Sequence, residues 1–337
     1  MTRSNFTAKR WYGLTRYVRG LAVLVAAGVV ALTVPAFARA YGWPLAPFDR
    51  QHAIRGAFDD PRLHIGLDGT VKASFHFGID IPAPGGTPVY SVSWGTAYRE
   101  RDAVAVRYHG HEFSYWHITA VVQEHQIVEE HQLLGYVKPA WGHVHFAEWI
   151  HGNYVNPLRP GALEPYVDTT TPVIVGIELV PRGGLVADVY DPATPPLPPP
   201  PWQDSRLMPA FVRWRLLRDG AVVRPWTTVV DFSRELLPAY EFDSVYDPEG
   251  TWQNKPDRPG RYLVWLDHGL DESWLGAGSY RVEVEASDLA HNTATRSFDV
   301  FVDQATRSRN DASAYTRRSR RWSPGSSVLR SRIHFAP

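Results

Sequence analysis

The segment FHFGIDI, residues 75–81, decides how the fold of this sequence is predicted. Its odd-numbered positions are large and apolar, whereas its even-numbered positions are histidine, glycine and aspartate. Successive side chains of a strand point to opposite faces. We therefore expect one strand over Ser74–Ile81 that buries an apolar row, made of Phe75, Phe77, Ile79 and Ile81. His76 and Asp80 then share the polar face, and Gly78 leaves room between them for another group to approach the backbone.

Two further segments show the same alternation. In GHVHF, residues 142–146, His143 and His145 point one way and two apolar side chains point the other way. In YWHI, residues 115–118, Tyr115 and His117 are expected to share a face. If the three polar faces coincide, they line one cleft with four histidines and one aspartate.

The composition restricts the chemistry of such a cleft. The 337 residues include no cysteine and fourteen histidines, nine of them between His76 and His151. Disulfides, cysteine zinc sites and a thiol nucleophile are therefore excluded. Zinc suits two imidazoles and one carboxylate, with water in an open fourth position. An isolated H-x-H pair more often lies on a solvated strand face, so it is the combination of three segments that indicates a metal.

These residues resemble the lysostaphin-type (LytM-like) zinc metalloendopeptidases, which cut peptide crosslinks of bacterial cell walls. The resemblance covers about residues 60–159. Its first motif, H-x-x-x-D, is matched by His76 and Asp80, its middle Y-x-H segment ends at His117, and its closing H-x-H is His143 to His145. The resemblance implies an antiparallel β-sheet metallopeptidase core in which His76, Asp80 and His145 bind zinc and His117 and His143 are the catalytic pair.

The sequence departs from that family pattern at three places. The stretch before the last motif, Leu134–Gly142, is short and bulky instead of glycine-rich. Ala147 stands where an acidic residue is common, and Glu148 is expected on the opposite face. No tyrosine occurs in residues 51–75, where some members carry one that assists catalysis.

Some polar residues near these motifs have a structural interpretation. Tyr115 could donate to an oxyanion, but a half-buried strand residue is the favoured interpretation. Asp288 and Asn292 are interpreted as turn residues and not as calcium ligands. The remaining histidines of the region are expected at the surface or in the groove: His109, His111, His125, His131 and His151.

The whole chain is predicted to be all-β. Short segments separated by glycine and proline turns continue to about residue 159, and Thr169–Pro172 marks a boundary. Beyond it, strands at sandwich-like spacing predict an immunoglobulin-like or fibronectin-like β-sandwich. The predicted order is a signal peptide (1–40), a zinc metallopeptidase-like β domain (41–168), a β-sandwich (169–302) and a disordered basic tail (303–337).

The two ends carry most of the positive charge. Residues 1–40 hold six basic and no acidic side chains, followed by an apolar run (20–34) and the triplet A-R-A (38–40). This order predicts a secretory signal and an exported protein, with an uncleaved membrane anchor as the alternative. The tail carries eight arginines against two aspartates, which leaves the region between the ends with a net charge of −12. Such an acidic body argues against nucleic acid as a partner.

Three functions are compatible with these features. The leading one is an exported zinc endopeptidase acting on peptidoglycan peptides, with the C-terminal domain or tail in contact with wall polymers. The second is a non-catalytic relative that binds cell walls or activates a hydrolase. The third is a structural protein that uses zinc only to hold strands together. The two histidines beyond the three expected ligands argue against it.

Overall fold

The computed structural model describes residues 40–65, 71–180, 184–269 and 275–302. These residues belong, from Tyr41 onward, to one compact unit. The predicted signal peptide (residues 1–39 of it) and the basic tail (303–337) lie outside the described residues. Within the described ranges, no helix is long and apolar enough to cross a membrane.

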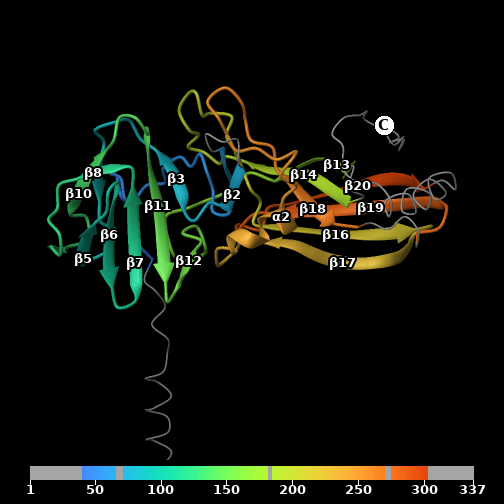
Figure 1. The fold of residues 1–337 in the computed structure, drawn as a ribbon, viewed down its shortest axis with the longest axis horizontal. Helices are drawn as coiled ribbons and strands as arrows, with labels where there is room; N and C mark the ends of the chain where they lie inside the picture. The colour runs from blue at the N-terminus through green and yellow to red at the C-terminus, as the bar shows by residue number, and fades with distance from the viewer. Residues whose placement is uncertain (1–39, 66–70, 181–183, 270–274, 303–337) are drawn as a thin grey trace, which may run out of the picture. The chain divides into compact units, whose positions relative to one another are not determined.

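The fold is all-β, as the sequence predicts (Figure 1). Three antiparallel sheets form the N-terminal part. They are built from β1 (Pro61–Ile65), β2 (Val71–Phe75), β3 (Ile79–Pro82), β4 (Pro88–Tyr90), β5 (Gly95–Arg99), β6 (Ala103–Tyr108), β7 (His111–Trp116), β8 (Ile118–Ala120), β9 (Ile127–Val128), β10 (Leu133–Val137), β11 (His143–Ile150) and β12 (Asn153–Val155).

The largest of these sheets has seven strands in the order β12-β11-β7-β6-β5-β9, and β3 also pairs with β11. Strand β11 therefore lies between β7 on one side and β3 and β12 on the other (Figure 1). Its side chains from His143 to Glu148 are all buried. This placement brings the three histidine-bearing segments of the sequence together on adjacent strands.

The prediction of one strand over Ser74–Ile81 is wrong. Strand β2 ends at Phe75 and β3 begins at Ile79, so the chain leaves one sheet and enters another within three residues. The expected apolar row is divided accordingly. Phe75 packs in the core of the C-terminal part, whereas Ile79 and Ile81 pack in the core of the N-terminal part. Phe77 is only half-buried and lies against the rings of His145 and Tyr154.

The room predicted at Gly78 has a clear structural cause. A Cβ atom at this position would lie 2.3 Å from the carbonyl oxygen of Phe146 and 3.0 Å from Cε1 of His145. Only glycine lets the chain pass this close to β11. The chain can thus change sheets here and still keep His76 and Asp80 beside that strand.

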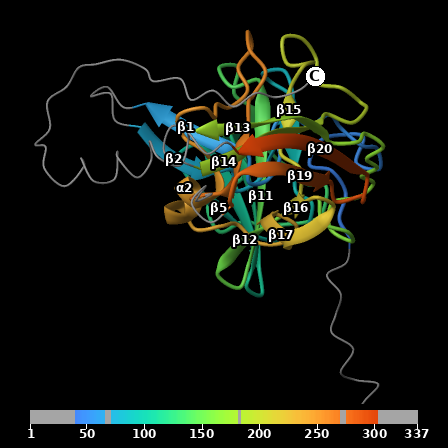
Figure 2. The same cartoon turned by 90° about the vertical axis from the view of Figure 1, so that its right-hand side faces the viewer.

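The C-terminal part consists of two four-stranded antiparallel sheets, in agreement with the predicted β-sandwich class. One has the order β17-β16-β19-β20, which Figure 2 shows in that sequence, and the other joins β13, β14, β15 and β18. Two short helical turns, η1 and α2, precede β18. The elements are β13 (Val173–Val180), β14 (Gly184–Pro192), β15 (Arg206–Leu207), β16 (Phe211–Arg218), β17 (Ala221–Asp231), η1 (Ala239–Glu241), α2 (Phe242–Val245), β18 (Leu263–Asp267), β19 (Gly278–Ser287) and β20 (Thr293–Val302).

The two cores are not divided cleanly in sequence. Ala193 and Leu207 come from the C-terminal part and pack in the N-terminal core. Phe75 comes from the N-terminal part and packs in the C-terminal core. The domain boundary at residue 168 therefore stays a prediction from the sequence.

Candidate metal centre

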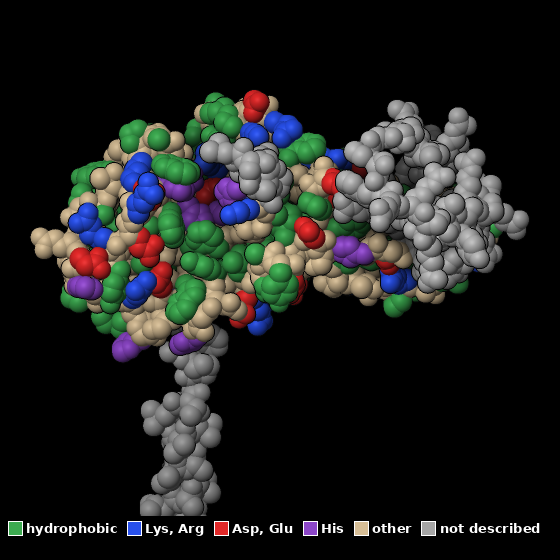
Figure 3. All heavy atoms as spheres, viewed as in Figure 1, with side chains coloured by type: hydrophobic (Ala, Val, Ile, Leu, Met, Phe, Trp, Pro, Cys, Tyr) green, Lys and Arg blue, Asp and Glu red, His purple; other side chains and the backbone are tan. Residues whose placement is uncertain are grey.

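The centre of the site is a cross-strand pair. His145 on β11 lies directly opposite Asp80 on β3, and Trp116 at the end of β7 faces His145 from the other side. His76 reaches the same point from the segment between β2 and β3. In the space-filling view, histidine side chains gather here with charged side chains beside them (Figure 3).

Three donor atoms converge at this point. Nε2 of His76 lies 2.7 Å from Nδ1 of His145, and Oδ1 of Asp80 lies 3.2 Å from each of these two nitrogens. Tetrahedral zinc with bonds of about 2.0–2.1 Å places neighbouring donors roughly 3.3 Å apart. Two sides of the triangle are close to that separation, and the His76–His145 side is shorter. These three residues could together hold a metal ion.

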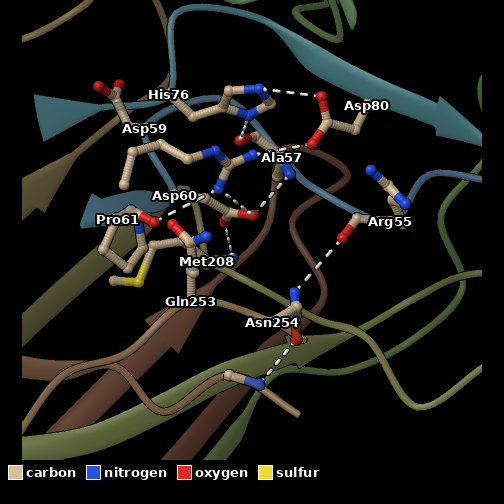
Figure 4. Close-up of polar contacts among 12 residues, drawn as sticks. Arg55, Ala57, Asp59, Asp60, Pro61, His76, Asp80, Met208, Gln253 and Asn254 are labelled. Carbon is tan, nitrogen blue, oxygen red and sulfur yellow. Dashed lines mark hydrogen bonds and ion pairs between the residues drawn. The ribbon is translucent and has the colours of Figure 1, made fainter. Parts of the chain in front are cut away.

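The hydrogen bonding of His76 fixes the direction of its free lone pair. Nδ1 of His76 lies 2.7 Å from the carbonyl oxygen of Ala57, which can only accept a hydrogen bond (Figure 4). The proton of a neutral His76 is therefore on Nδ1, and Nε2 presents a lone pair to Asp80 and His145. Such a carbonyl contact is the usual support of a metal-binding histidine. With lone pairs of Nε2 and the carboxylate facing each other, the donor set fits a cation.

The electrostatics keep these donors in the form that binds a metal. Burial, followed by the charge of Arg62, lowers the pKa of His76 to about 3 in spite of Asp80. Burial also lowers the pKa of His145. Burial alone raises the pKa of Asp80, but His76, His143 and Arg62 outweigh it and hold this pKa well below its ordinary value. Two neutral imidazoles and one ionised carboxylate result at neutral pH.

His143 lies one step along β11, beside the donor triangle. Its Nε2 is 3.4 Å from Oδ1 of Asp80. Its Nδ1 lies 2.7 Å from Nη2 of Arg55 and 2.8 Å from the carbonyl oxygen of Trp141. The guanidinium can only donate and the carbonyl can only accept, so Nδ1 can satisfy one of them at a time. His143 thus lies between Arg55 and the carbonyl of Trp141 on one side and Asp80 on the other.

His117 joins the site by a route that strand alternation does not describe. Strand β7 ends at Trp116, and His117 has a φ of +69°. Its ring stacks on Trp141, with centroids 3.7 Å apart, and lies 4.7 Å from the ring of His143. Burial, then His143 and His145, lowers the pKa of His117 to about 3. It is therefore a neutral imidazole at the rim of the donor triangle.

The expectation that Tyr115 shares a face with His117 is wrong. Tyr115 is fully buried in the N-terminal core, and its hydroxyl accepts a hydrogen bond from the amide of Val92. The turn at His117 reverses the alternation one residue after the strand ends. Tyr115 is thus a core residue, buried more deeply than the half-buried position favoured from the sequence.

Two arginines at the site were missed by the sequence interpretation. Nη2 of Arg62 lies 3.0 Å from Oδ2 of Asp80, and Arg55 contacts His143. The backbone carbonyl of Arg55 accepts a hydrogen bond from Asn254, and its guanidinium lies 4.1 Å from the ring centroid of Trp202 (Figure 4). Both partners come from loops of the C-terminal part. No motif or periodicity in residues 51–62 indicates these contacts.

The second H-x-H pair, His109 and His111, does not reach the site. His111 instead bonds Oε1 of Glu148, at 2.7 Å. Glu148 is fully buried and also accepts hydrogen bonds from Tyr41 and Arg159, at 2.5 Å each. As the sequence predicts, Glu148 points away from the metal donors. Its function here is to tie the start of the described chain to β11.

The geometry defines a candidate metal centre of two histidines and one aspartate, with two further histidines beside it. Residues 74–157 match the model of Peptidase family M23. The family resemblance that the three motifs indicate is thereby confirmed over these residues, and it supports a metallopeptidase.

Several solved structures are similar to part of the chain. A zinc-containing peptidase from Vibrio cholerae shares 23% identity over 37% of this chain and 41% of its own, with a TM-score of 0.30. Csd3 from Helicobacter pylori shares 20% sequence identity over 38% of this chain and 36% of its own, also with a TM-score of 0.30. The catalytic domain of the M23 protein EnpA from Enterococcus faecalis shares 26% sequence identity over 38% of this chain and 99% of its own, with a TM-score of 0.26. The chain thus spans about two fifths of the first two. No curated protein matches the chain.

Proposed function

We propose that this chain is an exported zinc metalloendopeptidase that hydrolyses peptide bonds of bacterial peptidoglycan. The observation that carries the proposal is the convergence of His76, Asp80 and His145 on one point, with His143 and His117 beside them. The match of residues 74–157 to Peptidase family M23 supports the reaction class. The order of basic, apolar and small residues in 1–40 supports export.

In this proposal, His76, Asp80 and His145 hold the zinc. When bound, zinc would polarise the scissile carbonyl and lower the pKa of a water molecule toward about 7. The carboxylate of Asp80 offsets part of the charge of the ion. The carbonyl of Ala57 keeps His76 in the tautomer that binds it.

His143 and His117 supply the proton transfers. A neutral imidazole carries one N–H donor and one nitrogen lone pair, so His117 can either donate or accept a hydrogen bond at the reacting group. One of the pair takes the proton of the attacking water and delivers it to the leaving amine, and the other donates to the carbonyl oxygen as charge develops there. Trp141 holds the ring of His117 in a fixed plane by stacking.

The test uses the full chain, its zinc content and the release of peptides from purified peptidoglycan, measured by mass spectrometry. We expect one zinc per chain and release of peptides. His145→Ala should lose both zinc and activity, whereas His143→Ala should keep zinc and lose activity. His64→Ala, on the exposed face of β1, is the matched control and should keep both.

Wild-type protein with neither zinc nor hydrolysis would overturn the proposal. Bound zinc without hydrolysis would favour the alternative, a non-catalytic protein that binds cell walls or activates a partner hydrolase. If the protein binds zinc and hydrolyses a soluble protein substrate but not peptidoglycan, the proposed reaction stands and the proposed substrate is wrong.

A further inference from the structure

A second group of metal-type ligands lies away from the histidine site. It consists of three aspartates from separate segments: Asp168 at the predicted domain boundary, Asp191 near the end of β14, and Asp288 directly after β19. One carboxylate oxygen from each lies within 4.8 Å of the others. All three residues are more than nine-tenths buried.

Two of the three carboxylates are held in place by hydrogen bonds. Asp168 accepts hydrogen bonds from the amide and hydroxyl of Thr170, at 2.9 and 2.6 Å, and from the hydroxyl of Tyr166, at 3.1 Å. Asp288 accepts from the backbone amide and side-chain amide of Asn292, at 2.8 and 2.7 Å. These bonds agree with the predicted turn role of Asp288 and Asn292, and they orient Asp288 toward the other two aspartates. The calcium site proposed below departs from the sequence interpretation that Asp288 is not a calcium ligand.

Asp191 is the exception. Its Oδ1 is buried and has no hydrogen-bond partner among the described residues. Burial, then the charges of Asp168 and Asp288, raises the pKa of Asp191 to about 9. A buried carboxylate that has one oxygen without a partner and faces two like charges is neutralised either by a proton or by a cation.

The space beside these carboxylates is small. All three aspartates line one cavity of about 30 Å³, whose other walls include apolar side chains such as Leu158 and Met208. A water molecule needs roughly 10–15 Å³ of such space. The cavity therefore has room for an ion with about one water, and an organic ligand does not fit.

We propose that Asp168, Asp191 and Asp288 bind a calcium ion. An all-oxygen donor set selects a hard cation over zinc, which favours nitrogen and sulfur ligands. Magnesium retains several waters, for which the cavity is too small, whereas calcium accepts protein oxygens in their place. The ion would join the segment after Tyr166 to the ends of two strands of the C-terminal part. The proposal is independent of the peptidase activity.

The test is a calcium titration of the full chain, freed of metals on a chelating resin and reloaded with one equivalent of zinc. Thermal unfolding and isothermal titration calorimetry follow the binding of CaCl2. We expect one calcium per chain and a rise in Tm of about 5 °C at a concentration 100 times the Kd. Asp191→Asn, which keeps the shape and removes the charge, should abolish both signals.

Two further variants make the result specific. Asp204→Asn, at an exposed aspartate, should keep the full calcium response. Asp80→Asn should lose zinc and still bind calcium, which separates this site from the histidine site.

Three results would overturn the proposal. One is no shift in Tm up to 10 mM CaCl2, roughly ten times the weakest Kd of extracellular calcium sites. Another is an equal shift in the Asp191→Asn variant, which indicates a general ionic effect. The third is an equal shift with MgCl2, which overturns the assignment to calcium.

Discussion

Replacing Gly78 by alanine tests whether the close approach of two backbone segments sets the geometry of the metal centre. The added Cβ would lie 2.3 Å from the carbonyl oxygen of Phe146, whereas carbon–oxygen contacts are ordinarily about 3.3 Å or longer. One segment must therefore move by roughly 1 Å. The residues that move are next to His145 on one side and two positions before Asp80 on the other.

Both stability and metal binding should suffer. Overpacking of this kind costs about 1–3 kcal/mol, which corresponds to a fall in Tm of roughly 3–10 °C for a chain of this size. A displacement of about 1 Å at a catalytic site can reduce the rate by ~100-fold. We expect Gly78→Ala to unfold at lower temperature, to bind zinc at least about tenfold more weakly, and to release peptides about 100-fold more slowly.

The matched control is Gly176→Ala on β13, because a Cβ atom there meets nothing within 4 Å and the backbone has no positive φ. It should keep the Tm, the zinc affinity and the activity of the wild type. Differential scanning calorimetry and zinc competition with a chromogenic chelator measure the first two quantities. If Gly78→Ala has wild-type Tm and zinc affinity, the close approach does not set the site.

Three further predictions concern single side chains of the N-terminal part. Glu148→Gln should destabilise the protein by about 3 kcal/mol at pH 7, because it leaves Arg159 without its buried partner. Burial raises the pKa of Glu148, but its hydrogen bonds outweigh burial and leave this pKa below its ordinary value. The stability that ionised Glu148 contributes is therefore present above about pH 4.3 and is lost as the pH falls through its pKa in the folded protein. The urea midpoints of the wild type and of Glu148→Gln should therefore converge in acid. Trp43→Ala should cost about 3–5 kcal/mol, since this indole is fully buried; a loss below ~1 kcal/mol in urea unfolding would contradict the packing. Trp141→Ala should keep the Tm of the wild type, because the indole is 46% exposed, and it should keep zinc. Its activity should fall about tenfold, because the ring of His117 loses the indole on which it stacks. An unchanged kcat would refute this.

The sequence predicted the donors better than it predicted their positions. His143 and His145 share a face because β11 is a regular strand, and Asp80 on β3 lies opposite His145. His76 lies between β2 and β3, so strand alternation does not account for its place beside them. The same rule failed for Tyr115 and His117, since it holds only while the backbone stays extended and His117 has a positive φ. His117 is at the site because the turn redirects it.

The sequence by itself determined the all-β class and, through the absence of cysteine, the kinds of chemistry that are excluded. It also indicated five candidate residues for the histidine site. It could not determine which strands are neighbours, because the alternation along a strand does not specify the strand with which it pairs. Tertiary structure alone decided the contacts of Arg55 and Arg62 with the site and the meeting of Asp168, Asp191 and Asp288. Those groups come from segments far apart in the chain, and only the packing of the sheets brings their charges within a few ångströms of one another.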